Sequence, residues 1–117
     1  MDLKEIKQKL LEFREERDWS KFHDPKNLAE AISIESGELL ELFLWKEKQD
    51  IIEEINKNKN YEEDVSDELA DILIYCLQMT NSLNLDPEKI IFNKLEKVIK
   101  KYPVEKAKGN VIKYNKL

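Results

Sequence analysis

The residues best suited to chemistry in this sequence are carboxylates that interrupt apolar helical stripes. Three- and four-residue spacing predicts one helical face whose middle member is an acid: Leu28, Ile32, Glu35, Leu39 and Leu42. Glu38 follows three residues after Glu35, so two carboxylates sit about one turn apart on that face. Burying an unpaired carboxylate costs free energy. Each of these carboxylates is therefore expected to form an ion pair, to be protonated or to bind a metal.

A second acidic pair has the same spacing further along the chain. Residues 69–77 form an apolar run in which Asp71 is the one charged side chain, and Glu68 lies three residues before it. Two helices that each offer a carboxylate pair toward a shared interior would bring four oxygen donors together. Oxygen donors of this kind suit a hard cation, Mg²⁺ or Mn²⁺.

The acidic pairs are also compatible with roles that need no metal. A single ExxE pair on a charged helix usually lies on a solvated face. Glu35 or Asp71 could pair with a buried Lys or Arg instead, although neither apolar stripe contains a basic residue. A helical interaction module with an acidic face for a basic partner would explain the charge, but not acids inside apolar stripes.

The composition indicates one small domain, residues 1–117. Charged residues make up 38% of the chain, and only two Gly and three Pro occur, which favours helices. The net charge of −5 is uneven: residues 30–71 contain fourteen Asp or Glu against four Lys, and residues 94–117 contain eight Lys against two Glu. An acidic protein has no general electrostatic attraction to nucleic acid, so no nucleic-acid partner is expected.

The location is predicted from the apolar runs and the cysteine content. No run approaches the roughly 20 apolar residues that span a bilayer, and the first residues lack the apolar stretch of a signal peptide. Cys76 is the single cysteine and lies in an apolar run, so we expect a buried thiol and no intramolecular disulfide. These features predict a cytoplasmic protein without a membrane partner.

Four long helices are expected to position the acids. Periodicity and capping predict them over about residues 2–17, 25–46, 61–82 and 87–102, with a short helix near residues 51–55. Residues 103–117 have no clear period and are predicted to form a C-terminal arm. The expected fold class is all-α, a four-helix bundle completed by oligomerisation, because a polar interior leaves limited apolar core for one subunit.

The acidic pairs and their surroundings resemble a known family. Glu35 and Glu38 followed by Glu68 and Asp71 are similar to the ExxE…ExxD signature of the MazG-like, all-α nucleoside triphosphate pyrophosphohydrolases. Four further segments are similar to the dCTP pyrophosphatase branch of that family: FREERDW (13–19), FHDPKNL (22–28), ELFLWK (41–46) and KYP (101–103). The likeness covers about residues 5–108.

The resemblance implies a cofactor, an assembly and a set of substrate contacts. The cofactor would be Mg²⁺, with Mn²⁺ as a substitute, bound by the four acids, and the assembly a homodimer or homotetramer. The implied nucleotide-binding residues are Trp19, His23, Trp45 and Tyr75, with Lys46 and Lys94 as candidates for neutralising phosphates. Taken without the resemblance, either Trp is more often a core residue than a base-stacking one, and either Lys is more often a surface residue.

The expected reaction is hydrolysis of a nucleoside triphosphate to the monophosphate and pyrophosphate, in maintenance of the nucleotide pool. Glu38 is the predicted catalytic carboxylate, and dCTP or a modified dCTP the predicted substrate. Hydrolysis of dUTP, of NTPs broadly or of phosphoribosyl-ATP are the alternatives among enzymes. Two departures bear on the base: Leu10 stands where animal members of the dCTP branch have His, and Val98 where many relatives have Asn.

Overall fold

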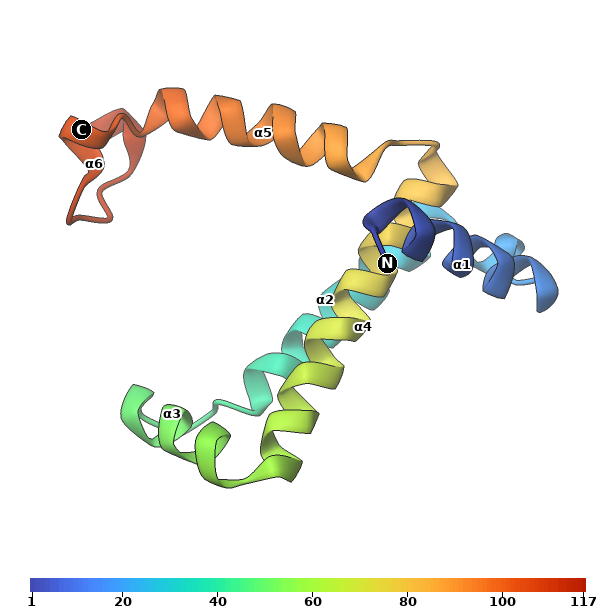
Figure 1. Ribbon diagram of the computed structural model, residues 1–117, viewed down its shortest axis with the longest axis horizontal. Coiled ribbons are helices and arrows are strands. Elements are labelled where there is room, and N and C mark those ends of the chain that lie inside the picture. The colour runs from blue at the N-terminus through green and yellow to red at the C-terminus, as the bar shows by residue number, and fades with distance from the viewer. The chain divides into compact units, whose positions relative to one another are not determined.

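The computed structural model of the protein describes all residues, 1–117, and contains helices but no β-strand (Figure 1). In chain order the elements are α1 (Leu3–Glu16), the short 3₁₀-helix η1 (Ser20–Phe22), α2 (Pro25–Glu41), α3 (Lys48–Lys57), α4 (Lys59–Leu83), α5 (Pro87–Lys101), α6 (Val104–Ala107) and the 3₁₀-helix η2 (Tyr114–Lys116). None of these helices combines the length and the apolar character needed to cross a membrane. The prediction of an all-helical chain is confirmed.

The chain divides into two compact units, Met1–Asn84 and Leu85–Leu117. In the first unit α4 is the central helix: α2 packs along it, and α1 and α3 also contact it (Figure 1). The single domain and the four-helix bundle stay predictions, as does assembly into an oligomer.

Capping residues set the helix starts that the sequence predicts. Asp24 lies in extended conformation before Pro25 and accepts a hydrogen bond from the backbone nitrogen of Asn27 at 2.8 Å. This contact satisfies one of the backbone N–H groups that have no partner in the first turn of a helix. Asp86 does the same for α5, accepting from the backbone nitrogen of Lys89 at 3.2 Å.

The end of α2 differs from the prediction. The apolar pattern extends to about Lys46, but α2 ends at Glu41 and the next residues form turns. At the last of these turns Trp45 has a φ of 64°, in the left-handed region, which a helix cannot contain. The hydroxyl of Tyr61, from α4, donates to the carbonyl of Leu42 at 2.6 Å. A tertiary partner therefore takes up a carbonyl that a continuing helix would have used, and periodicity along the chain does not reveal it.

Little apolar surface is fully buried in this chain. Leu28 and Tyr61, at 2% and 7% exposure, are the only buried hydrophobic residues. In contrast, Leu40 on α2 and Leu73 on α4 are 65% and 62% exposed. Cys76 is half-buried, so the expectation of a fully buried thiol is wrong. Within one copy of the chain, part of the apolar surface of α2 and α4 is therefore left exposed.

The second unit, Leu85–Leu117, consists of α5 and the residues that follow it. The ring of Tyr114 packs edge-on against that of Tyr102, with 6.1 Å between the centroids, and its backbone nitrogen donates to the Tyr102 hydroxyl at 3.2 Å. The segment predicted as an arm, residues 103–117, therefore contains two short helices and returns to the end of α5. Its role stays a prediction.

Candidate functional site

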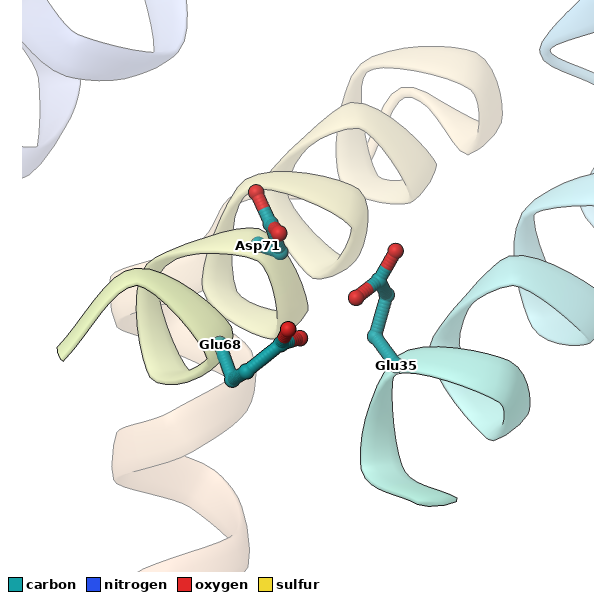
Figure 2. Close-up of side chains that lie close together, drawn as sticks. All are labelled: Glu35, Glu68 and Asp71. Atoms are coloured by element: carbon teal, nitrogen blue, oxygen red, sulfur yellow. The ribbon is translucent and has the colours of Figure 1, made fainter. Parts of the chain in front are cut away.

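Three of the predicted acids lie together between two helices. Glu35 on α2 and Glu68 and Asp71 on α4 each place a carboxylate oxygen within 4.8 Å of the others. Figure 2 shows the three side chains pointing toward one another across the gap between the helices. The cluster follows from helical spacing, because Glu68 and Asp71 are three residues apart on one face and Glu35 belongs to the half-buried face of α2.

The carboxylates of this cluster have no protein partner that compensates their charge. None of the ion pairs in the structure involves Glu35, Glu68 or Asp71. The Oε2 atoms of Glu35 and Glu68 are buried and accept no hydrogen bond. Glu68, close enough to share a proton, raises the pKa of Glu35, and burial adds to the rise. A cation between the helices would satisfy these oxygens and remove the repulsion.

Glu38 lies beside the cluster and not among its three closest oxygens. Its neighbour Glu35 raises the pKa of Glu38, first through a proton that the two carboxyls can share and then through repulsion. Glu38 is the most exposed of the four acids, since the other three are half-buried. The structure thus brings three of the predicted ligands together and leaves the fourth at the edge, where water has access to it.

Tyr75 continues the acidic face of α4. It lies four residues after Asp71, one helical turn further along, and its side chain is half-buried. A ligand that reached past the acid cluster along this face would meet its phenol ring. The substrate-binding role of Tyr75 stays a prediction.

Trp19 and His23 enclose the short helix η1 before α2. The Trp19 ring, 41% exposed, packs edge-on against Phe13 at 5.6 Å between centroids and lies 6.2 Å from the His23 ring. Burial, together with the positive charge of Arg14, lowers the pKa of His23, which favours the neutral form of its ring. His23 Nδ1 is buried and has no hydrogen-bond partner.

Trp45 lies beyond the opposite end of α2. Its side chain is 94% exposed, which is unusual for the largest apolar residue. The 17 residues of α2 span about 25 Å between the two tryptophans. A single base therefore cannot lie between Trp19 and Trp45 of the same chain, although the resemblance implies that both contact the nucleotide.

The two lysines predicted to contact phosphates lie in different settings. The Lys46 ammonium pairs with Glu54 and lies 4.2 Å from the centre of the Tyr61 ring, and the Glu54 hydrogen bond raises the pKa of Lys46. Lys94 is an exposed residue of α5 in the second unit. Lys46 would have to leave Glu54 before it could reach a phosphate.

The sequence interpretation missed Arg14, a buried charged residue of α1 with 9% exposure. The signal was available: Arg14 lies four residues after Leu10, so it interrupts an apolar stripe just as Glu35 does. Ser82, its partner on α4, carries no comparable signal because serine is common on any helix surface.

Comparisons with known proteins identify the family of this chain. The MazG-like family model matches residues 31–117, which include all four acids. The protein dCTP pyrophosphatase 1 of Rattus norvegicus is 34% identical over 115 residues, covering 98% of this chain and 67% of the relative, and the Homo sapiens protein of that name is 32% identical over the same length. A crystal structure of a pyrophosphatase from Archaeoglobus fulgidus superposes with a TM-score of 0.77 at 40% identity, covering 86% of this chain and 92% of that one. On the family match and on these identities, this chain belongs to the MazG-like family.

Proposed function

We propose that this chain hydrolyses a cytosine deoxynucleoside triphosphate, dCTP or a 5-modified form, to the monophosphate and pyrophosphate. Its family and its relatives support the general activity, a nucleoside triphosphate pyrophosphohydrolase. The observation that carries the proposal is the convergence of Glu35, Glu68 and Asp71 from two helices, with none of the three in an ion pair. The identity of the metal and the identity of the base are our own proposals.

The acid cluster fits a divalent cation. Three carboxylates within 4.8 Å supply oxygen ligands and a negative charge that a hard cation prefers. We assign Glu35, Glu68 and Asp71 as ligands of Mg²⁺, with Glu38 as the fourth and Mn²⁺ as a substitute. When bound, Mg²⁺ supplies charge neutralisation on the phosphate oxygens of the substrate.

Glu38 is assigned the proton transfer. Its exposed position at the edge of the cluster leaves room for a water molecule, and its carboxylate can accept a proton from that water. As Glu38 takes the proton, the water oxygen bonds to phosphorus and the link between the α- and β-phosphates breaks. The electron pair of the broken bond leaves on the departing phosphate oxygen.

The base contacts are assigned to Trp19, His23 and Tyr75 of one chain and to Trp45 of a second copy. A ring that stacks on both indoles must receive Trp45 from another subunit, because α2 separates the two tryptophans within one chain. The exposed apolar faces of α2 and α4 also favour a homodimer or homotetramer. Lys46 and Lys94 are assigned to the phosphates.

The test is product analysis with a panel of nucleotides. Each of the four dNTPs, dUTP and phosphoribosyl-ATP is incubated with the protein in Mg²⁺ or in EDTA, and pyrophosphate and orthophosphate are measured. We expect pyrophosphate, dependence on Mg²⁺ and the highest kcat/KM for dCTP or its 5-methyl form. Orthophosphate as the sole inorganic product, or turnover that persists in EDTA, contradicts the mechanism. Equal kcat/KM across the dNTPs contradicts only the choice of base, and absence of all turnover favours a non-enzymatic interaction module.

A further inference from the structure

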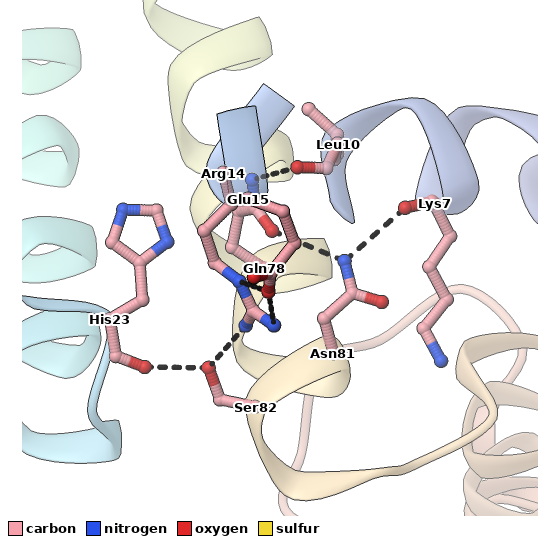
Figure 3. Close-up of polar contacts among 8 residues, drawn as sticks. All are labelled: Lys7, Leu10, Arg14, Glu15, His23, Gln78, Asn81 and Ser82. Carbon is pink, nitrogen blue, oxygen red and sulfur yellow. Dashed lines mark hydrogen bonds and ion pairs between the residues drawn. The ribbon is translucent and has the colours of Figure 1, made fainter. Parts of the chain in front are cut away.

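A chain of hydrogen bonds joins three elements at the junction of α1 and α4. A guanidinium nitrogen of Arg14 (Nη1) donates to the Ser82 hydroxyl at 3.3 Å, and that hydroxyl donates to the backbone carbonyl of His23 at 2.5 Å. Figure 3 shows this path from α1 through α4 to the residue before the cap of α2. We call it the Arg14–Ser82–His23 relay.

The burial of Arg14 indicates that the relay is a specific contact. Its Nε and Nη2 atoms donate to one carboxylate oxygen of the exposed Glu15, at 3.3 and 2.9 Å, and the Arg14 side chain is 11% exposed. Burying a guanidinium costs free energy unless its donors are satisfied. A hydroxyl that accepts from a cation is also a stronger donor, so Arg14 strengthens the bond from Ser82 to His23.

The relay fixes one end of the segment 19–23. At the other end, the backbone nitrogen of Trp19 donates to the carbonyl of Arg14 at 3.0 Å, and the Trp19 ring packs on Phe13. Within the segment, Phe22 and His23 donate to the carbonyls of Trp19 and Ser20 at 2.9 and 3.2 Å. The segment is thus one short turn held at both ends, and Arg14 takes part at each end.

Packing alone does not hold this segment in place. A hollow of about 310 Å³ lies beside it, bordered by Arg14, Ser20, His23 and Ser82 among others. Because side chains do not fill this space, the segment has room to move toward α4 or away from it if the bond to the His23 carbonyl is lost. The hydrogen bond of Ser82 opposes such a movement from the side of α4, and the side chain of Asn27 opposes it from α2 by donating to the Phe22 carbonyl at 3.2 Å.

We infer that Arg14 and Ser82 are positioning residues for nucleotide binding, which act by holding the segment that carries Trp19 and His23. This inference rests on the proposed function, which assigns those two side chains to the base. Neither Arg14 nor Ser82 belongs to the acid cluster. Their loss weakens substrate binding and leaves the chemical step intact.

Three variants of α4 distinguish an effect on the position of the segment 19–23 from an effect on the stability of the fold. Ser82→Ala removes the relay, and Ser82→Thr keeps the hydroxyl. Asn81→Ala is the matched control, because it removes a different contact between α4 and α1, from Asn81 Nδ2 to the Lys7 carbonyl at 3.2 Å. We expect Ser82→Ala to raise KM for dCTP about tenfold with kcat within about twofold, while Ser82→Thr and Asn81→Ala keep the KM of the parent. Arg14→Lys, which loses the planar fork but keeps the charge, carries the test if Ser82→Ala does not fold.

A second readout does not depend on turnover. In a Trp45→Phe background Trp19 is the only tryptophan, so its fluorescence reports the position of the segment. We expect acrylamide to quench Trp19 more strongly in Ser82→Ala than in the parent, and equally in Asn81→Ala and the parent. Unchanged KM and unchanged quenching in Ser82→Ala overturn the inference. If quenching changes in Ser82→Ala but the unsubstituted protein hydrolyses no nucleotide, the relay still positions the segment and the proposed function is rejected instead.

Discussion

At the scale of single residues, the pKa shifts in the acid cluster link metal binding to stability. The pKa of Glu35 is raised above its ordinary value of 4.5, mainly by Glu68, so the native metal-free protein binds more protons than the unfolded chain. Its free energy of unfolding therefore falls as pH rises from the ordinary value through the raised one. The repulsion is absent below this window and fully present above it.

Glu35→Gln should remove this repulsion. In EDTA at about pH 7.5 we expect the variant to unfold at a higher temperature than the parent protein, with the difference vanishing near pH 4, where the parent carboxyl is protonated. Adding Mg²⁺ should raise the thermal midpoint of the parent and not that of the variant. Thermal unfolding followed by circular dichroism measures both effects. A variant that is less stable than the metal-free parent at the higher pH would show that the cluster is held by contacts other than a metal.

Glu38→Gln tests the assignment of the proton transfer. The amide keeps the size of the side chain but cannot accept a proton, so we expect kcat to fall by at least about 100-fold. Binding of dCTP in the presence of Ca²⁺, measured by calorimetry, should change little. Glu41→Gln is the control, since Glu41 lies on the same helix outside the acid cluster. Equal losses of kcat in Glu38→Gln and Glu41→Gln would contradict the assignment of Glu38 as the proton acceptor.

At the scale of elements, predictions from the sequence succeed where the information is local. The caps at Asp24 and Asp86 and the three-residue spacing of Glu68 and Asp71 are properties of neighbouring residues, and the structure bears out the helices that they predict. The end of α2 and the placement of Trp45 depend on α4, which lies elsewhere in the chain. Distance along α2 likewise separates Trp19 from Trp45, which the resemblance implies as two contacts of one nucleotide.

Tyr61→Phe measures the contact that ends α2. The change removes the hydroxyl that donates to the Leu42 carbonyl but keeps the ring beneath Lys46. Leaving a half-buried acceptor without its donor should lower the free energy of unfolding by about 1 kcal/mol. Urea denaturation gives this value. Tyr102→Phe removes a more exposed tyrosine contact, to the Tyr114 nitrogen, and should cost less. If the two variants lose equal stability, the contact at Leu42 has no special part in ending the helix.

At the scale of the whole molecule, the distance between the tryptophans leads us to predict that the active site is shared between two copies of the chain. A two-fold dimer can bring Trp45 of one copy to the Trp19 end of another, because an isologous interface repeats every contact in both directions. Each site would then contain Trp19, the acids and Tyr75 from one chain and Trp45 from its partner. A monomer would retain the acid cluster but only part of the surface for the base.

Mixing two variants that each bind dCTP weakly tests this shared site. Trp19→Ala and Trp45→Ala should each raise KM for dCTP strongly, since base stacking contributes about 1–3 kcal/mol per ring. When the two proteins are unfolded together and refolded, half of the dimers are mixed, and each mixed dimer contains one site with both tryptophans. Activity at low dCTP should then recover to roughly a quarter of that of the parent, whereas refolding either variant alone recovers nothing. Light scattering at a mass above one 14.0 kDa chain confirms that the oligomer forms. If the oligomer forms but mixing restores no activity, the two tryptophans do not contribute to one shared site. If the protein is a fully active monomer, the shared site is excluded.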